Sequence, residues 1–460
     1  MYPPHNPLSA ARVVWTHRAE RRIQTHLIRA DGGHAGLTGL VADVSERLAG
    51  AFPRADAVVV LDLYLGFRVR PGEYILLIDV RDREAPGTCI VKLADDARLA
   101  QEMDAWLACQ PRGFRGNGVF MALHPHYRAD YPHRFAALVY QDAGPHIGAD
   151  EVVWLEAATL RAVRFDSPDT RTVIGAVRTL FTQLGHVLYQ NSRVELPAGG
   201  HIALNPARDG GHRRHRLADA LHAWTAPAAA DVRRQVVAAF PAEGEGFIDP
   251  IDYFRYLEDE LAAGVPPASV LPRVVRGPAH GDLHGRNVLV GIEQNAVGPP
   301  ALYDYEHLSC DNLVGWDFVK LETELKIRAL EAIYPPGGLA AFAEWVGAFE
   351  LRLARRTRAC HDQHEEWPDR ADATARPGEP EKLARLEAVV LGVRREAAIH
   401  LGLRNREWLH EYYFLLGCYA LYTGHFENQS DRQRAAALVS GGVAAPLCQG
   451  LRPNIQEGAT

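Results

Sequence analysis

The pattern of hydrophobic residues changes once along this chain, near Gly144, and that change constrains the fold more than any other feature. Before it, short runs rich in Val, Ile, Leu and Tyr are separated by Pro-Gly turns, a pattern typical of β-strands. After it, apolar residues recur at helical spacing over most of the remaining length. We therefore predict an α+β protein in which a small, mostly antiparallel sheet precedes a large helical region.

The first region should form a small lobe over residues 56–144. Its strand-like runs lie at 57–65, 73–80, 87–94 and 135–141. Asp95 can cap a helix after the third run. Leu99, Met103 and Trp106 fall on one face of that helix, which should pack on the sheet. Residues 1–55 mix short helical patterns with Pro and Gly, and we interpret them as an N-terminal extension.

The second region, residues 145–460, should form a large helical lobe. Helices are expected near 172–190 and 213–224, after Asp249-Pro250, from Asp317 to about residue 330, and after residue 382. The last of these has an apolar stripe consisting of Leu383, Leu386, Val390, Val393 and Ala397. The intervening stretch 365–382 is charged and rich in proline, which favours an exposed loop.

Composition excludes several classes of partner. The chain has a formal net charge of -7 and 23% charged residues, so it lacks the basic excess of a nucleic-acid binder. Its six cysteines show no paired C-x-x-C spacing for zinc or redox chemistry. The amino terminus lacks the order of a secretory signal, and no apolar run reaches the length that a bilayer requires. We expect a cytoplasmic protein with reduced thiols and no affinity for membranes.

The residues that carry chemistry lie in the segment 280–287, HGDLHGRN, and in the strand that ends at Asp304. Asp282 stands five residues before Asn287, and Asp304 follows seventeen residues later. Mg²⁺ takes few protein oxygens and completes its shell with water and phosphate oxygens. We therefore assign Asn287 and Asp304 to Mg²⁺ in complex with ATP. Asp282 is left to orient an acceptor hydroxyl and to accept its proton.

The run from His280 to Asn287, followed by Asp304, resembles the catalytic loop and metal-binding aspartate of the aminoglycoside phosphotransferase and choline kinase group. Asp317, in Gly-Trp-Asp, is similar to the aspartate that braces the catalytic loop in that group. The block also resembles the kinase-like "ternary complex associated" domains of bacterial signalling and conflict systems. The resemblance implies a protein-kinase-like bilobal fold, with ATP and Mg²⁺ as cofactors.

Plainer interpretations of these residues stay open. HGD can form a tight turn, with Asn287 and Asp304 merely capping loops. We interpret His280 and His284 as structural, because no third His or Cys lies nearby to complete a zinc site. In the resembling family, such histidines hydrogen-bond the loop backbone.

Lys92 should supply the other half of the site. Only four residues are lysines, Lys92, Lys320, Lys326 and Lys382, among 50 basic residues, so a lysine marks a position where a guanidinium does not serve. The resemblance implies that Lys92 contacts the α and β phosphates and that a glutamate of the next helix fixes it. Glu102 qualifies, since it lies at the edge of the buried helix face. The alternative is a strand-end lysine that extends to solvent.

One segment departs from the sequence pattern of the resembling family, and the role of a second segment is left open. The family covers the phosphates with a Gly-rich turn, but residues 64–72 contain two glycines and two arginines. Arginine can bind phosphate, although a non-catalytic member would also show a poor glycine loop. At the expected hinge, Gln141 and Ala143 are candidates for main-chain contacts to adenine. A buried strand that ends in a turn explains the same residues equally well.

Three functions follow as hypotheses. The first is transfer of the γ-phosphoryl group of ATP to a hydroxyl of a small-molecule acceptor, bound by the helices between about 150 and 275 and after 381. The second is a kinase-like nucleotide-binding or scaffold module, a pseudokinase, with a protein partner. The third, phosphorylation of a protein, is disfavoured because a helix follows Asp304 after about a dozen residues, leaving no recognisable activation segment.

Overall fold

The chain divides into two compact units, which we describe separately. The computed structural model describes residues 12–21, 23, 37–63, 73–82, 87–109, 119–127, 134–140, 151–196, 217–240, 246–335, 337–362, 367, 381–423, 426 and 429–451. The sheet unit comprises Met1–Ala149 and Ala301–His307, and the helical unit comprises Asp150–Pro300 and Leu308–Thr460.

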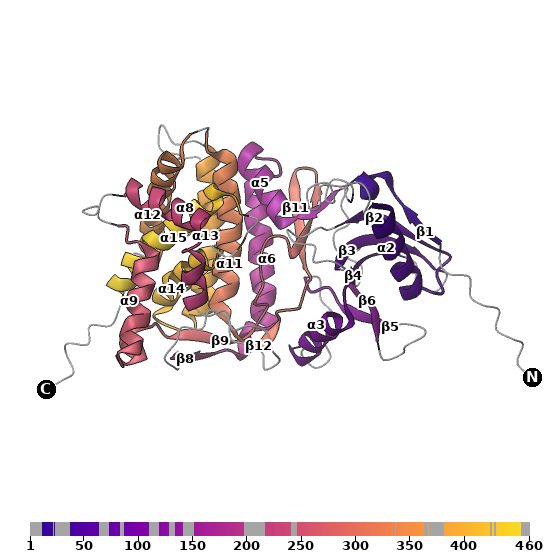
Figure 1. Ribbon diagram of the computed structural model, residues 1–460, viewed down its shortest axis with the longest axis horizontal. Coiled ribbons are helices and arrows are strands. Elements are labelled where there is room, and N and C mark those ends of the chain that lie inside the picture. Colours follow the sequence, from indigo (N-terminus) through magenta and orange to yellow (C-terminus); the bar gives the residue numbers. More distant parts are fainter. Residues whose placement is uncertain are drawn as a thin grey trace, which may run out of the picture. The chain divides into compact units, whose positions relative to one another are not determined.

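The sheet unit is built on six strands in the order β1-β2-β3-β4-β6-β5 (Figure 1). The strands are β1 (Arg12–Trp15), β2 (Ala57–Leu63), β3 (Tyr74–Arg81), β4 (Gly87–Leu93), β5 (Leu123–Tyr127) and β6 (Phe135–Tyr140). Neighbouring strands are antiparallel except β1 and β2, which run parallel. The four predicted strands are therefore present as β2, β3, β4 and β6, with small differences at their ends.

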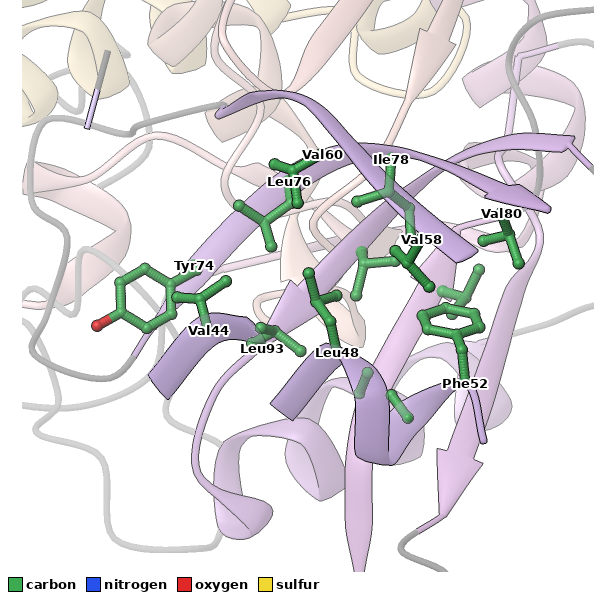
Figure 2. Packing of buried hydrophobic residues seen from close by; sticks show 14 of the residues in the cluster. Val44, Leu48, Phe52, Val58, Val60, Tyr74, Leu76, Ile78, Val80 and Leu93 are labelled. Atoms are coloured by element: carbon green, nitrogen blue, oxygen red, sulfur yellow. The ribbon is translucent and has the colours of Figure 1, made fainter. Parts of the chain in front are cut away.

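Strand alternation divides the side chains of β4 between two faces of the sheet. Val91 and Leu93 belong to a hydrophobic core shared with helix α2 (Leu37–Ala51). Figure 2 shows this core, with Val44, Leu48, Phe52, Val58, Val60, Leu76, Ile78 and Val80 among its labelled residues. Lys92 lies between Val91 and Leu93 in sequence and therefore points to the opposite face. Because a slip of one residue would exchange the two faces, this core fixes the direction of Lys92.

The expected boundary at residue 55 is not a boundary in the structure. Strand β1 pairs with β2, and the Trp15 indole donates a 2.9 Å hydrogen bond to the Ser45 hydroxyl of α2. Val44 and Leu48 of α2 are fully buried. The described part of the presumed extension is thus a layer of the sheet unit, because its apolar residues cover a sheet face that would otherwise contact water.

The helical unit contains most of the helices. They are α5 (Leu155–Phe165), α6 (Thr170–Val187), η2 (Tyr189–Asn191), α7 (Leu217–Ala223), α8 (Pro227–Ala239), α9 (Pro250–Ala262), α10 (Pro267–Val270), α11 (Val314–Ile333), α12 (Leu339–Asp362), α13 (Glu381–Gly402), α14 (Trp408–Tyr422) and α15 (Asp431–Gly450). As predicted, Asp249 caps α9 by accepting a 2.9 Å hydrogen bond from the Ile251 amide. Helix α11 is buried over most of its length, so other helices surround it.

Two small sheets frame the segment 280–287 within the helical unit. Their strand orders are β11-β10-β7 and β12-β9-β8. The strands are β7 (Glu151–Trp154), β8 (Arg193–Glu195), β9 (Val274–Ala279), β10 (Val288–Glu293), β11 (Ala296–Leu302) and β12 (Ser309–Leu313). Gln294 and Asn295 have φ angles of 46° and 66°, as a two-residue type I′ hairpin turn requires. The predicted hairpin after Asn287 is therefore present.

The predicted fold class is confirmed. A mostly antiparallel sheet with helix α3 (Asp96–Cys109) between β4 and β5 precedes a mainly helical region, which is the arrangement expected of this α+β class. Asp304 was expected with the helical lobe, but residues 301–307 group with the sheet unit.

Residues 64–72, Gln141 and Ala143, and nearly all of 365–382, lie outside the described residues. Among the helices that are described, none combines the length and apolar character needed to cross a bilayer.

Candidate functional site

Lys92 is the centre of a cluster of carboxylates in the sheet unit. Its side chain is only 1% exposed, and its Nζ lies 2.8 Å from Glu102 Oε2 and 2.9 Å from Asp304 Oδ1. Glu306 and Glu73 follow at 3.5 and 3.6 Å. We call these five residues the lysine cluster. The predicted pairing of Lys92 with Glu102 is present, and the alternative, in which Lys92 extends to solvent, is not what the structure shows.

Glu102 also fixes the segment that carries Asp304. Its Oε1 accepts a 2.8 Å hydrogen bond from the Tyr305 amide and another from the Tyr140 hydroxyl. The same segment is held by backbone hydrogen bonds from Met121 N to Leu302 O, 3.1 Å, and from Leu302 N to the carbonyl of Val119, 2.6 Å. These bonds explain why residues 301–307 belong to the sheet unit.

The backbone of Asp304 adopts a conformation that few side chains accept. Its φ angle is 62°, in the left-handed region where Asp and Asn are the commonest residues after Gly. Non-glycine residues in this region cost about 1–3 kcal/mol and cluster at functional sites. The Asp304 side chain is 20% exposed, so this carboxylate remains accessible to a ligand.

The carboxylates determine the protonation of Lys92. Burial by itself favours the neutral amine, but Asp304 and Glu102 outweigh it and hold the pKa of Lys92 well above its ordinary value. Arg98 donates to Glu73 and is the second cation at the cluster. Within the described part of the chain, the four carboxylates of the lysine cluster thus meet two cations, Lys92 and Arg98, and the cluster carries an excess of negative charge.

In the helical unit, Asp317 of α11 holds the start of the segment 280–287. Its Oδ2 accepts hydrogen bonds of 2.9 Å from the His280 amide and from the Tyr189 hydroxyl, and its Oδ1 accepts one of 2.8 Å from the Gly281 amide. Gly281 has a φ angle of 75°, which glycine adopts without steric cost. Burial raises the pKa of Asp317 despite these donors. The contacts match those expected of a bracing aspartate.

Asp282 and Asn287 contact each other across the turn of this loop. The Asn287 amide nitrogen donates to the Asp282 carbonyl at 2.9 Å and to Asp282 Oδ2 at 3.3 Å. Because this nitrogen faces Asp282, the amide oxygen is the atom that Asn287 can offer a metal ion. The turn is closed by a 2.9 Å hydrogen bond from the Asn287 backbone amide to the His284 carbonyl.

The two histidines accept hydrogen bonds from the loop backbone, as predicted for a structural role. His280 Nδ1 accepts from the Asp282 amide and His284 Nδ1 accepts from the Arg286 amide, each at 3.3 Å. Burial lowers the pKa of His284 to about 3, so this ring is neutral near pH 7. No group of three His, Cys, Asp or Glu side chains that could hold a metal ion is present among the described residues.

Sequence reasoning missed Lys320. This residue of α11 donates a hydrogen bond from Nζ to Asp282 Oδ1, and its side chain is only 9% exposed. The rarity of lysine was a signal that could have identified it, and so was its spacing of three residues from Asp317, which places both on one helix face.

The chemistry of the candidate ligands fits Mg²⁺. Asn287 offers an amide oxygen and Asp304 a carboxylate, both hard donors of the kind that magnesium prefers. The excess negative charge of the lysine cluster favours a cation beside Asp304. Strands β10 and β11 connect the two residues along the chain, but Asn287 lies in the helical unit and Asp304 in the sheet unit. Their joint action is therefore a proposal.

A family model described as "Ternary complex associated domain 9" matches residues 237–423. This range contains the segment 280–287, Asp304 and Asp317, and it leaves out strands β1 to β6. A search of curated proteins finds no significant match.

Three solved kinase structures are similar to the chain over most of its length. A glucosamine kinase is 12% identical with a TM-score of 0.30, covering 86% of this chain and 90% of its own. Choline kinase from Cryptosporidium parvum Iowa II is 11% identical with a TM-score of 0.32, covering 84% and 90%. Plasmodium vivax ethanolamine kinase is 10% identical with a TM-score of 0.28, covering 82% and 81%. Similarity at this level gives no information about substrate.

Proposed function

We propose that this protein is an ATP-dependent phosphotransferase that moves the γ-phosphoryl group to the hydroxyl of a small-molecule acceptor. The main support for the proposal is the geometry of the lysine cluster. A charged amine is held at full burial by Glu102 and Asp304, and Asp304 occupies a strained backbone conformation. A purely structural ion pair needs neither the excess of carboxylates nor the strain.

In the proposed reaction, the acceptor hydroxyl oxygen forms a bond to the γ-phosphorus while the bond from that phosphorus to the bridging oxygen of ADP breaks. The hydroxyl proton passes to the carboxylate of Asp282. Lys92 binds the α and β phosphates, with Glu102 holding its amine in place. Asp317 supports the reaction by fixing the backbone before Asp282.

Magnesium would be held by Asn287 and Asp304 and would supply neutralisation of charge on the phosphate oxygens. The residues themselves contribute orientation. Asn287 is anchored to Asp282 through its amide nitrogen, and Asp304 is anchored to Lys92. Gln141 and Ala143 stay predictions for the adenine contact.

The family match favours a second candidate function. Its description names a ternary complex, which supports a kinase-like nucleotide-binding module that acts with a protein partner. Such a module would bind Mg-ATP through the same residues but would not transfer the phosphoryl group at a useful rate.

One experiment separates the two candidates. Thermal unfolding is measured with Mg-ATP and with EDTA. ATP turnover is then measured with a panel of small hydroxyl compounds as acceptors (sugars, amino alcohols and glycerol) for wild type, Asp282→Ala and the exposed control Asp362→Ala. We expect Mg-ATP to raise the melting temperature, and we expect Asp282→Ala alone to reduce turnover, by roughly 10²-fold or more. The reason is that Asp282 accepts the proton, whereas Asp362 lies at the exposed end of α12.

Each possible result has one meaning. If wild type is not stabilised by Mg-ATP, the enzyme proposal is wrong. Binding without turnover in wild type favours the nucleotide-binding module. Turnover that Asp282→Ala leaves unchanged removes Asp282 from the reaction.

A further inference from the structure

Helix α11 presents a polar stripe to the segment 280–287. Its members are Asp317, Lys320, Glu324 and Arg328, spaced three, four and four residues apart, which is the spacing of one helix face. Asp317 accepts from the backbone of the loop, Lys320 donates to Asp282, and Glu324 lies 3.7 Å from the guanidinium of Arg286. The stripe therefore contacts the loop on both sides of Asp282.

Lys320 stands at the middle of this stripe in a buried position. Its Nζ lies 5.7 Å above the centre of the Tyr419 ring, and the Tyr419 hydroxyl donates a 2.8 Å hydrogen bond to Glu324. The ring thus supports the ammonium from one side while Asp282 accepts from it on another. A methylene chain that is packed in this way loses much of its freedom, so the ammonium has a defined position.

A contribution to the stability of the fold does not explain why a lysine is buried at this position. A buried ion pair contributes little net stability compared with apolar residues that fill the same space. The next lysine of α11 shows what a structural site looks like, because Lys326 reaches two carboxylates, Glu322 at 2.9 Å and Glu350 at 2.7 Å. Lys320 instead contacts the side chain to which we assign proton transfer.

Asp282 requires such a partner because a carboxylate turns easily about its last side-chain bond. Terminal torsions of this type are broad, with no sharp preferred angle. In the structure, Lys320 contacts Oδ1, while the Asn287 amide lies 3.3 Å and the His284 Nε2 3.7 Å from Oδ2. Lys320 is the member of this set that brings an ammonium group to the carboxylate. The three contacts define the plane of the carboxylate.

We propose that Lys320 is a positioning residue for phosphoryl transfer, which acts by holding Oδ1 of Asp282 so that the carboxylate keeps the orientation needed to accept the hydroxyl proton. This proposal rests on the proposed function. A displacement of about 1 Å at a reacting group costs roughly 10²-fold in rate. Loss of Lys320 should therefore reduce the turnover number and leave nucleotide binding, assigned to Lys92, nearly intact.

The test compares three variants in Mg-ATP turnover and in Mg-ATP binding by calorimetry. Lys320→Met removes the charge at similar length and should lower kcat roughly 10²-fold, with the Kd for Mg-ATP changed less than about threefold. Lys320→Arg should recover part of the loss, since it restores a donor with different geometry. Lys382→Met, at an exposed position on α13, should behave as wild type.

Chemical rescue distinguishes positioning from a structural role. Lys320→Ala should regain turnover in proportion to added propylammonium, which replaces the missing methylene groups and ammonium, and sodium chloride at equal ionic strength should not restore it. Asp282→Ala should not respond to propylammonium. Lys320→Met turnover equal to wild type would overturn the proposal, and so would loss of folded protein without rescue of Lys320→Ala. Wild-type protein that binds no Mg-ATP would show instead that the proposed function itself is wrong.

Discussion

The two units of the molecule bury charged side chains in different ways. In the helical unit, Arg394 of α13 forms two hydrogen bonds to Glu322 of α11, at 2.9 and 2.7 Å, and Lys326 joins Glu322 to Glu350 of α12. We call these four residues the buried network. It contains two acids and two bases, and its described members are nearly inaccessible to solvent.

The lysine cluster of the sheet unit has the opposite balance. Lys92 meets four carboxylates, and Asp304 and Glu306 among them stay partly exposed. Charges in a balanced set satisfy one another, so the buried network needs no ligand. An unbalanced set that reaches solvent lowers its energy when a cation binds. Charge balance, rather than burial alone, therefore separates a structural ion network from a candidate binding site.

The largest expected effect comes from breaking the balance of the buried network. Arg394→Met leaves Glu322 charged and fully buried without its main partner. Burial would then raise the pKa of Glu322, which Arg394 and Lys326 now hold well below its ordinary value. We expect a loss of about 3–5 kcal/mol in the free energy of unfolding, measured by urea denaturation.

The matched control for this change is Arg358→Met on α12. Arg358 is 51% exposed and pairs with Asp362 within one turn, so its loss should change stability by less than about 0.5 kcal/mol. Equal effects of the two substitutions would mean that the buried network contributes no more than a surface pair.

The second prediction concerns Glu411 of the helical unit, a buried carboxylate whose hydrogen-bond donors are amide groups. It accepts 2.8 and 3.0 Å bonds from the Val275 amide and the Asn405 side chain, but burial raises its pKa from 4.5 to about 7. The folded protein therefore holds this proton more tightly than the unfolded chain. The resulting stabilisation is complete below about pH 4.5 and is lost as the pH rises to about 7.

We therefore expect wild type to lose up to roughly 3 kcal/mol of stability between pH 4.5 and 8 through this one group. Glu411→Gln should lack that loss, so the free energy of unfolding of the variant relative to wild type should increase with pH. Chemical denaturation at pH 5 and pH 8 measures the difference. A constant difference between the two proteins would show that Glu411 is charged at both pH values.

The smallest expected effect on the stability of the ligand-free protein comes from a substitution in the lysine cluster. Asp304→Asn keeps a residue that tolerates the left-handed backbone and removes one of the excess negative charges. Stability without ligand should change by less than about 1 kcal/mol. Stabilisation by Mg-ATP, worth about 2.7 kcal/mol at a ligand concentration 100 times the Kd, should largely disappear.

Asp79→Asn provides the control for Asp304→Asn within the same unit. Asp79 is partly exposed on β3 and lies 3.6 Å from Arg81, so this variant should keep the stabilisation by Mg-ATP. Retention of that stabilisation in Asp304→Asn would remove Asp304 from the metal site. A loss of stability without ligand as large as that of Arg394→Met would show that the lysine cluster is a structural network too.

Sequence patterns identified those site residues whose predicted roles depend on neighbours close to them in the sequence. The spacing from Asp282 to Asn287, the cap at Asp95 and the edge position of Glu102 depend on neighbours within one loop or helix. Arg98 N donates to Asp95 at 3.0 Å, and Glu102 is fully buried beside Lys92, as predicted. The catalytic, nucleotide and metal roles of these residues stay predictions.

Apart from the contact of Asp317 with the loop, the contacts that join distant segments were not predicted. Tyr189 and Asp317 are 128 residues apart, and Glu322 and Arg394 are 72 apart. Helix α11 reads in sequence as a helix with one apolar face at Phe318, Leu321 and Leu325, and a polar side of that kind usually faces water. Other helices enclose it instead, so its charged residues had to find partners from outside the helix.

Sequence patterns alone predict the order of sheet and helices, the loop at Asp282 and the lysine that pairs with Glu102, because periodicity and short spacings act within single elements. Long-range packing, by contrast, places the described residues between 12 and 51 in the sheet unit, anchors Asp304 there and brings Lys320 to Asp282. Burial explains why these contacts depend on packing. A charged or apolar side chain taken out of water must find its partners among whichever segments packing brings beside it, and those segments are far apart in this chain.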